Sequence, residues 1–224
     1  MFDKSQFSYN AETHLGFYKG KLVPSTTQLL ELFYPISNKI KKEILKKAAD
    51  RGTLVHNNIE DFNNYFITNQ RFPPIDNDTS KEIKNYYSLL KAYDLRPIYA
   101  EQMIFLLDEN GELICYGHYD FVLECMKTNE LFNCLECYLF DAKTTSTFDK
   151  KKTKLQTQIY RVACNQLGLD LNGKTCGMWL REDNANIYPF EEIEDKKVIA
   201  LCKVLREQWN GNNNWKNRQD NFNT

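Results

Sequence analysis

The sequence lacks a surplus of charge of either sign and lacks any long apolar run. Its 29 Lys and Arg residues are balanced by 30 Asp and Glu residues. The overall charge therefore predicts no general affinity for polyanions, and nucleic-acid binding would need local patches or a metal. No apolar stretch is long enough to span a membrane, and the first residues hold no apolar core of a secretion signal. We expect no membrane partner.

Zinc-finger spacing is also missing. Cys134 and Cys137 form a CxxC pair, but neither a second pair nor two histidines follow at a suitable distance. A metal role and a role as ordinary thiols both stay open for this pair, and the second is favoured. The seven cysteines are an odd number, which favours reduced thiols and a cytoplasmic location. The abundance of Asn and Lys suggests an AT-rich genome such as that of a phage, which would make the host cytoplasm the compartment.

What the sequence does contain is the periodicity of an α/β protein. Apolar residues recur at helical spacing in three segments, residues 40–66, 154–167 and 198–209. Strand-like runs occupy residues 98–107, 113–124, 135–143 and 175–181. We predict one α/β domain over residues 1–209, with a mixed central sheet flanked by helices, and a loose tail over residues 210–224.

Capping boxes predict two further helices. Ser25 with Gln28, and Thr79 with Glu82, have the spacing at which a hydroxyl and a carboxamide or carboxylate satisfy each other's backbone donors. Helices are therefore expected to begin just after Pro24 and just after Thr79.

Two aspartates and a lysine lie in the strand-like segments. Asp141 and Lys143 are two residues apart, so both side chains leave the strand from one face, and Asp120 lies in the preceding run. A buried sheet does not tolerate such charges without partners. Two carboxylates can hold Mg²⁺ or Mn²⁺, and an ammonium beside them can stabilise charge that develops on a phosphate. Solvent-facing strand ends are the alternative, but the three together favour a catalytic site.

Other elements offer further metal ligands. His56, one of three histidines, follows Gly52 at the predicted start of a helix, and a neutral imidazole can ligate Mn²⁺ or Mg²⁺. Glu60 lies one turn further on the same face and either orients His56 or is structural. Glu101, in the first strand-like run, is another candidate for the metal, and an exposed strand residue is the alternative.

The helix after the Asp-x-Lys strand carries candidates for DNA contacts. Gln156 and Tyr160 are four residues apart and share one face. A carboxamide can bond a phosphate or a base edge, and a tyrosine offers a hydroxyl and a stacking ring. Lys154 and the lysines at 150–152 could attract phosphates. The alternative is an ordinary amphipathic helix with a solvated charge run.

Five motifs follow one another along the chain: Gly52-xxx-His56, Glu101, Gly117-xx-Asp120, Asp141-x-Lys143 and Gln156-xxx-Tyr160. In this order and spacing the segment 24–167 resembles the RecB-like branch of the PD-(D/E)XK nuclease superfamily. The resemblance implies a mixed four-stranded, restriction-endonuclease-like core with a cleft that admits DNA. It also implies metal ligation by His56, Asp120, Asp141 and the Ala142 carbonyl, catalysis by Lys143, and substrate contacts by Gln156 and Tyr160.

The resemblance extends to size and excludes one cofactor. The short chain is similar to stand-alone phage recombination or Cas-associated exonucleases, and a homo-oligomer that encircles DNA is compatible with this. Some relatives hold an iron–sulfur cluster through one early cysteine and three late ones. Here no cysteine precedes Cys115, and the late Cys164, Cys176 and Cys202 are widely spread, so we expect no iron–sulfur cluster.

The sequence thus predicts a deoxyribonuclease that depends on Mg²⁺ or Mn²⁺ and hydrolyses phosphodiester bonds with a metal-activated water. Its partner would be linear double- or single-stranded DNA, in recombination or repair. An exonuclease is favoured. A structure-selective endonuclease remains an alternative, as does a catalytically inactive nucleic-acid-binding module of the same fold, although every charged position of the motifs is filled.

Overall fold

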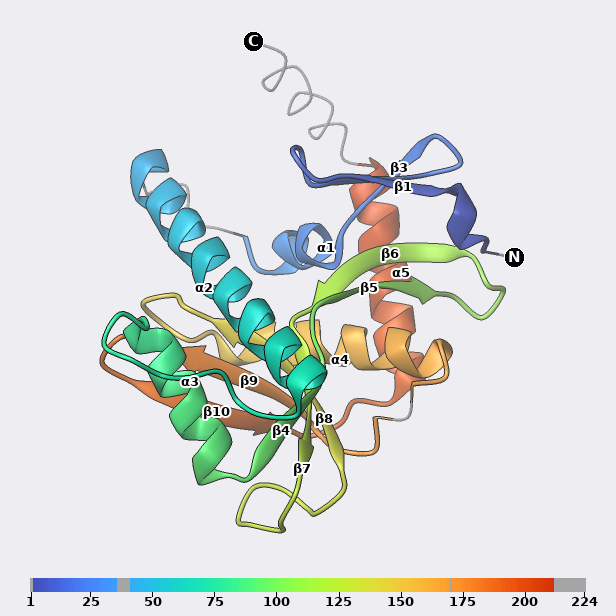
Figure 1. Ribbon diagram of the computed structural model, residues 1–224. Coiled ribbons are helices and arrows are strands. Elements are labelled where there is room, and N and C mark those ends of the chain that lie inside the picture. The colour runs from blue at the N-terminus through green and yellow to red at the C-terminus, as the bar shows by residue number, and fades with distance from the viewer. Residues whose placement is uncertain (1, 36–40, 170, 212–224) are drawn as a thin grey trace.

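The computed structural model describes residues 2–35, 41–169 and 171–211. It is an α/β fold in which helices cover both faces of a central five-stranded sheet (Figure 1). The strands of this sheet are β4 (Leu95–Tyr99), β7 (Phe121–Cys125), β8 (Cys137–Lys143), β9 (Thr175–Leu180) and β10 (Ala185–Phe190). They lie in the order β10-β9-β8-β7-β4.

The sheet is mixed because one neighbouring pair is parallel. β8 and β9 run in the same direction, and the other neighbours are antiparallel. Parallel neighbours need a long crossover, and α4 (Lys150–Gln166) provides it. The carboxyl ends of β8 and β9 therefore meet at one edge of the sheet. The predicted mixed sheet flanked by helices is confirmed, with five strands where the resemblance implies four.

Each face of the sheet has its own apolar core. On one face α2 (Lys42–Asn69) and α3 (Lys81–Ala92) pack against residues such as Phe140 of β8. On the other face α1 (Thr26–Phe33), α4 and α5 (Asp195–Gly211) pack against Leu139. Figure 1 shows α2 and α3 on one side of the sheet and α4 with α5 on the other. The alternation of side chains along β8 explains why adjacent residues serve different cores.

A second set of strands lies beside the central sheet. β5 (Gln102–Leu107) and β6 (Leu113–Tyr119) form a hairpin. The first residues form η1 (Lys4–Gln6) and a meander of β1 (Phe7–Asn10), β2 (Leu15–Tyr18) and β3 (Lys21–Val23). Its aromatic side chains pack on this hairpin, where the ring of Phe7 lies 4.9 Å from that of Phe105 and 5.1 Å from that of Tyr116.

The long predicted strands 98–107 and 113–124 are each broken in two. β4 gives way to β5 at residues 100–101, and β6 gives way to β7 at Asp120. The two breaks lie at the same level, because Gln102 pairs with Tyr119 on one side and Tyr99 with Val122 on the other. The double strand thus leaves the central sheet in one bend, and this bend carries Glu101 and Asp120.

Helix boundaries follow the capping residues. The Ser25 and Gln28 box is present as predicted, but α3 is capped by Ser80, whose side chain accepts from Ile83, so the predicted Thr79 box is wrong by one residue. The Thr79 hydroxyl instead bonds Asp76. α4 begins at Lys150, four residues before the predicted start, because Asp149 caps it.

The other predicted helices differ at their ends. α2 is one continuous helix from Lys42, so His56 lies in its middle and not at the start of a helix, and the predicted starting point at residue 40 lies outside the described residues. α5 extends through Gly211, two residues into the segment predicted as a loose tail. Residues 212–224 of that tail also lie outside the described residues.

Among the described helices, none combines the length and the apolarity that crossing a membrane requires. All seven cysteines are free thiols, and Cys134 is the exposed one while Cys137 is half-buried.

Candidate functional site

The pairing of β7 with β8 brings Asp120 and Asp141 to the same level. Phe121 pairs with Phe140 in this antiparallel ladder, so the residue before one and the residue after the other face each other. The two rings are fully buried and stacked, with centroids 5.5 Å apart and planes at 18°. The backbone N–H of Ala142 donates to Oδ2 of Asp120 at 2.5 Å, which fixes that carboxylate against β8.

Lys143 lies on the same face of β8 as Asp141, as the two-residue offset predicts. Its Nζ is 2.6 Å from Oδ2 of Asp141. The Asp141 side chain is 2% exposed and that of Lys143 is 26% exposed. The carboxylate is therefore held inside the protein, and the Lys143 side chain that pairs with it remains partly accessible to solvent.

His56 approaches the pair from α2. Its Nδ1 lies 3.2 Å from Oδ1 of Asp120, and both side chains are partly accessible to solvent. Glu60 is half-buried one turn further along α2. An imidazole, two carboxylates and an ammonium from three distant segments of the chain thus lie in one cluster, which we call the acidic site (His56, Asp120, Asp141 and Lys143).

The two aspartates of the acidic site differ in pKa, because their surroundings shift the two pKa values in opposite directions. Burial raises the pKa of Asp141 to about 6, Asp120 adds to this rise, and Lys143 opposes it. Burial alone would also raise the pKa of Asp120, but His56 and then Lys143 lower it below its usual value. The pKa of His56 is raised, chiefly by Asp120. Two carboxyl groups with different proton affinities are typical of functional sites.

Glu101 lies at the rim of the site, in the bend between β4 and β5. It is exposed to solvent. Partial desolvation, followed by the carboxylates of Asp120 and Glu60, raises the pKa of Glu101. It is thus near enough to interact electrostatically with the acidic site. Another histidine, His118, packs its ring 5.4 Å from that of Tyr9 on the side of the meander.

Gln156 and Tyr160 lie beneath the site and not at its surface. They are 6% and 3% exposed, and Nε2 of Gln156 donates to the Tyr160 hydroxyl at 2.8 Å. Gly117 makes room for this ring, because a Cβ there would lie 2.7 Å from Cε1 of Tyr160. Burial, and then Asp141, raise the pKa of Tyr160 well above its usual value. Lys154, the third residue expected to contact DNA, is half-buried on the first turns of α4.

The acidic site contains the ligand types of a divalent-metal site, but its side chains are not arranged around a common point. Within the described residues, no three His, Cys, Asp or Glu side chains converge on a common point. Lys143 and His56 instead pair with the two aspartates. Two carboxylates, one imidazole and a backbone carbonyl are ligand types that suit Mg²⁺ or Mn²⁺, so the residue types present fit such an ion.

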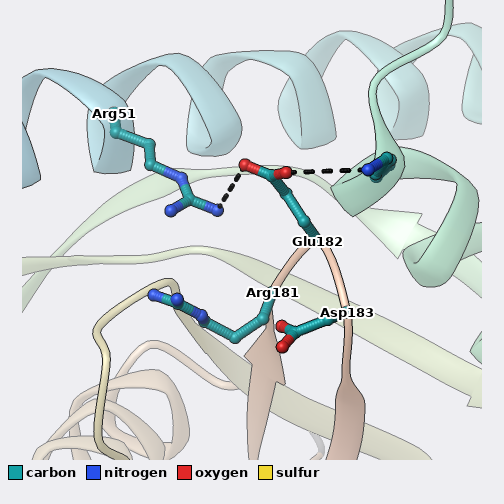
Figure 2. A pocket seen from close by; sticks show the side chains of 5 residues that line it. Arg51, Arg181, Glu182 and Asp183 are labelled. Carbon is teal, nitrogen blue, oxygen red and sulfur yellow. Dashed lines mark ion pairs between the residues drawn. The ribbon is translucent and has the colours of Figure 1, made fainter.

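A charged pocket opens near the segment that follows β8. It has a volume of about 430 Å³ and is lined by Arg51, Lys81, Arg181, Glu182 and Asp183. Figure 2 shows Glu182 between two cations, 3.5 Å from Arg51 and 3.8 Å from Lys81. Nη1 of Arg181 lies 3.4 Å from the carbonyl oxygen of Thr144, the residue after Lys143. No motif in the sequence marks Arg181 as a site residue, because it reaches this place through the parallel pairing of β9 with β8.

Comparison with known proteins adds little. No protein-family model and no curated protein matches the chain. A solved crystal structure of a protein named SSO0001 is similar at 15% identity with a TM-score of 0.34, and the match covers 55% of this chain and 55% of that one. The chain thus spans about half the length of that structure, and a likeness this low supports no statement about function.

Proposed function

We propose that the chain is a DNA nuclease that depends on Mg²⁺ or Mn²⁺ and acts as an exonuclease. The observation that carries this proposal is the acidic site, in which Asp120, just before β7, lies level with Asp141 of the neighbouring β8, and the Lys143 ammonium is 2.6 Å from Asp141. Its members occupy the motif positions of the RecB-like PD-(D/E)XK nucleases, and the proposal includes a core of that restriction-endonuclease-like type.

Each residue of the site has a defined task in this proposal. His56, Asp120 and Asp141, with the carbonyl of Ala142, would hold the ion. A divalent ion supplies charge neutralisation at the phosphate and lowers the pKa of water. Lys143 would place its ammonium beside the scissile phosphate and stabilise the negative charge that develops there.

The surroundings keep these groups in place. The stacked Phe121 and Phe140 hold the two strands level behind the aspartates. The buried hydrogen bond between Gln156 and Tyr160 supports the same region from below, so these residues act by positioning in the present arrangement. Because burial raises the pKa of Asp141 to about 6, metal binding should release protons near and below pH 6, whereas at higher pH the cation has only the Lys143 contact to displace.

Digestion of DNA of different topology tests the proposal. Purified protein is incubated with linear and closed-circular DNA in Mg²⁺, in Mn²⁺ or in EDTA, beside Asp120→Asn. We expect loss of linear DNA in either ion, intact circles, and no loss in EDTA or with the variant. Nicked circles would instead indicate an endonuclease, and intact DNA in every lane would leave only a binding module.

Metal binding is expected to stabilise the fold. An ion at about a hundred times its dissociation constant adds about 2.7 kcal/mol to the free energy of unfolding, which corresponds to a rise in Tm of about 5–10 °C. We expect this rise for the wild type in Mg²⁺ or Mn²⁺ by differential scanning fluorimetry. Asp141→Asn should lose most of it, whereas Asp61→Asn, an exposed acid on α2, should keep it. An equal rise in both variants would place the ion elsewhere.

A further inference from the structure

Three aromatic side chains stand together on the sheet face that carries Asp141 and Lys143. Trp179 of β9 pairs with Lys143 of β8, so both point to the same face. Tyr188 of β10 pairs with Gly177, which in turn pairs with Asp141. Phe148 comes from the segment between β8 and α4. These three rings, which we call the aromatic patch (Phe148, Trp179 and Tyr188), therefore lie on the same face of the sheet as Asp141 and Lys143, with Trp179 directly beside Lys143.

Contacts with one another and with the backbone hold the rings of the aromatic patch in place. Phe148 and Tyr188 stack with centroids 4.6 Å apart and planes at 20°, and Trp179 lies 6.4 Å from Phe148. Gly177 admits the ring of Phe148, because a Cβ there would lie 2.4 Å from its Cζ. The indole N–H of Trp179 donates to the carbonyl of Thr145 at 2.8 Å. All three rings are only half-buried, so part of each remains open to a ligand.

Cations border the patch where helix electrostatics disfavour them. Four lysines lie in the first turns of α4, at positions 150, 151, 152 and 154, and the first turn contains no acid. The amino end of a helix carries partial positive charge, so lysines there reduce helix stability. Within the described residues, none of the ion pairs involves these four lysines. Lys174 and then Lys154 lower the pKa of Glu191, so Lys154 lies near that carboxylate, whereas Lys150, Lys151 and Lys152 enter no ion pair among the described residues and can meet an anionic ligand.

Lys150 connects the lysines to the rings. Its Nζ lies 4.3 Å from the centroid of the Tyr188 ring. Because Phe148 covers one face of Tyr188, the ammonium takes the other face. The face of Tyr188 that the exposed Lys150 caps becomes a stacking position once the ammonium moves to a neighbouring phosphate.

We propose that the aromatic patch and its lysines bind single-stranded DNA, with unpaired bases stacked on Tyr188 and Trp179 and phosphates paired with the α4 lysines. The inference rests on the proposed function and adds a preference for unpaired strands. Base faces inside a duplex are already stacked on one another, so only an unpaired strand can offer them to protein rings. The patch would thus hold the strand that enters or leaves the acidic site.

Binding without cleavage tests this proposal. Fluorescence anisotropy is measured in EDTA with a labelled oligothymidylate and with a labelled duplex, at several salt concentrations. We expect Tyr188→Leu to weaken single-strand binding about tenfold, since one base–ring stack is lost, with little change for the duplex. Tyr188→Phe should restore binding. The control Tyr65→Leu, a half-buried ring on α2, should bind as the wild type does.

The salt dependence of binding distinguishes the contribution of the rings from that of the lysines. Tyr188→Leu removes no charge, so the slope of log K against log salt should stay unchanged. Lys150→Met should reduce that slope by about 0.7, as expected for one phosphate contact to a single strand.

Tryptophan fluorescence gives a measurement on the unaltered protein. Oligothymidylate should quench this fluorescence, and Trp179→Phe should remove most of the quenching although two tryptophans remain.

The outcomes distinguish this inference from the proposed function. Wild-type affinity of Tyr188→Leu for the oligothymidylate, an equal loss of duplex binding, or no binding by the wild type would overturn the patch as a single-strand site. Binding as expected, together with no cleavage in Mg²⁺ or Mn²⁺, would support the patch and reject catalysis. Melting temperatures of all variants, measured beside the binding, show that each is folded.

Discussion

Replacement of Lys143 by methionine is expected to slow DNA hydrolysis about a hundred- to a thousandfold while the protein stays folded. Loss of a single group that stabilises developing charge has effects of this size. Methionine keeps most of the apolar stem, and the Lys143 side chain is already 26% exposed, so little packing is lost. The measurement is the rate of release of nucleotides from linear DNA under single-turnover conditions in Mg²⁺.

The variant has a second expected effect, on Asp141. The Lys143 ammonium opposes the rise in the pKa of Asp141 that burial causes. Without the ammonium this pKa should rise above about 6, and a larger fraction of Asp141 would hold a proton at neutral pH. Metal affinity should therefore fall, and a Mg²⁺ titration at two pH values separates this loss from the loss in the chemical step.

A matched lysine controls for charge. Lys203 of α5 forms an exposed ion pair with Glu109, 2.6 Å away, and takes no part in the acidic site. Lys203→Met should cleave at the wild-type rate. If Lys143→Met also cleaved at that rate, the ammonium would have no catalytic role and the proposed mechanism would lose its central group.

The parts of the site that depend on local geometry were predictable from the sequence. Alternation along a strand puts Asp141 and Lys143 on one face, and the structure shows them paired. The spacing of Ser25 and Gln28 gives a capping box, which is present. In both cases the partners lie within three residues of each other, where backbone geometry alone decides the outcome.

The relation of Asp120 to Asp141 was not predictable in the same way. It depends on the register of β7 against β8, which is set by burial of Phe121 against Phe140. The apolar periodicity also did not predict the bend at residues 100–101 and 120. Tyr119 and Phe121 on either side of the bend are both fully buried, each in a different core, so the apolar pattern continues across it. A strand that changes sheets looks continuous in the sequence.

Burial explains the remaining differences. The four-residue spacing of Gln156 and Tyr160 correctly places them together, as their hydrogen bond shows. It does not tell which face of α4 is covered, and α4 is buried along much of its length. The strand β10 was not predicted, because its half-buried residues show no clear alternation and it contains Pro189.

Truncation of Phe140 to alanine is expected to lower the free energy of unfolding by about 3–5 kcal/mol, as for other buried aromatic residues. For a chain of this size, the corresponding fall in Tm is about 6–20 °C. The ring is fully buried and stacks on Phe121, so its removal opens a cavity behind the two aspartates. Thermal unfolding followed by circular dichroism gives the measurement. Phe33→Ala, at a ring that is 55% exposed, should cost about 0.5 kcal/mol or less.

The Phe140 ring should also affect metal binding, because it helps to set the register of β7 against β8 and so the position of Asp120 opposite Asp141. Phe140→Leu keeps apolar volume in the core but removes the stacked pair, so it should unfold at a temperature between those of the wild type and Phe140→Ala. If the stack holds Asp120 opposite Asp141, the folded Leu variant should bind Mn²⁺ more weakly than the wild type does. A Phe140→Ala protein that melts no lower than Phe33→Ala would show that this pair does not hold β7 against β8, and the two carboxylates would need another support.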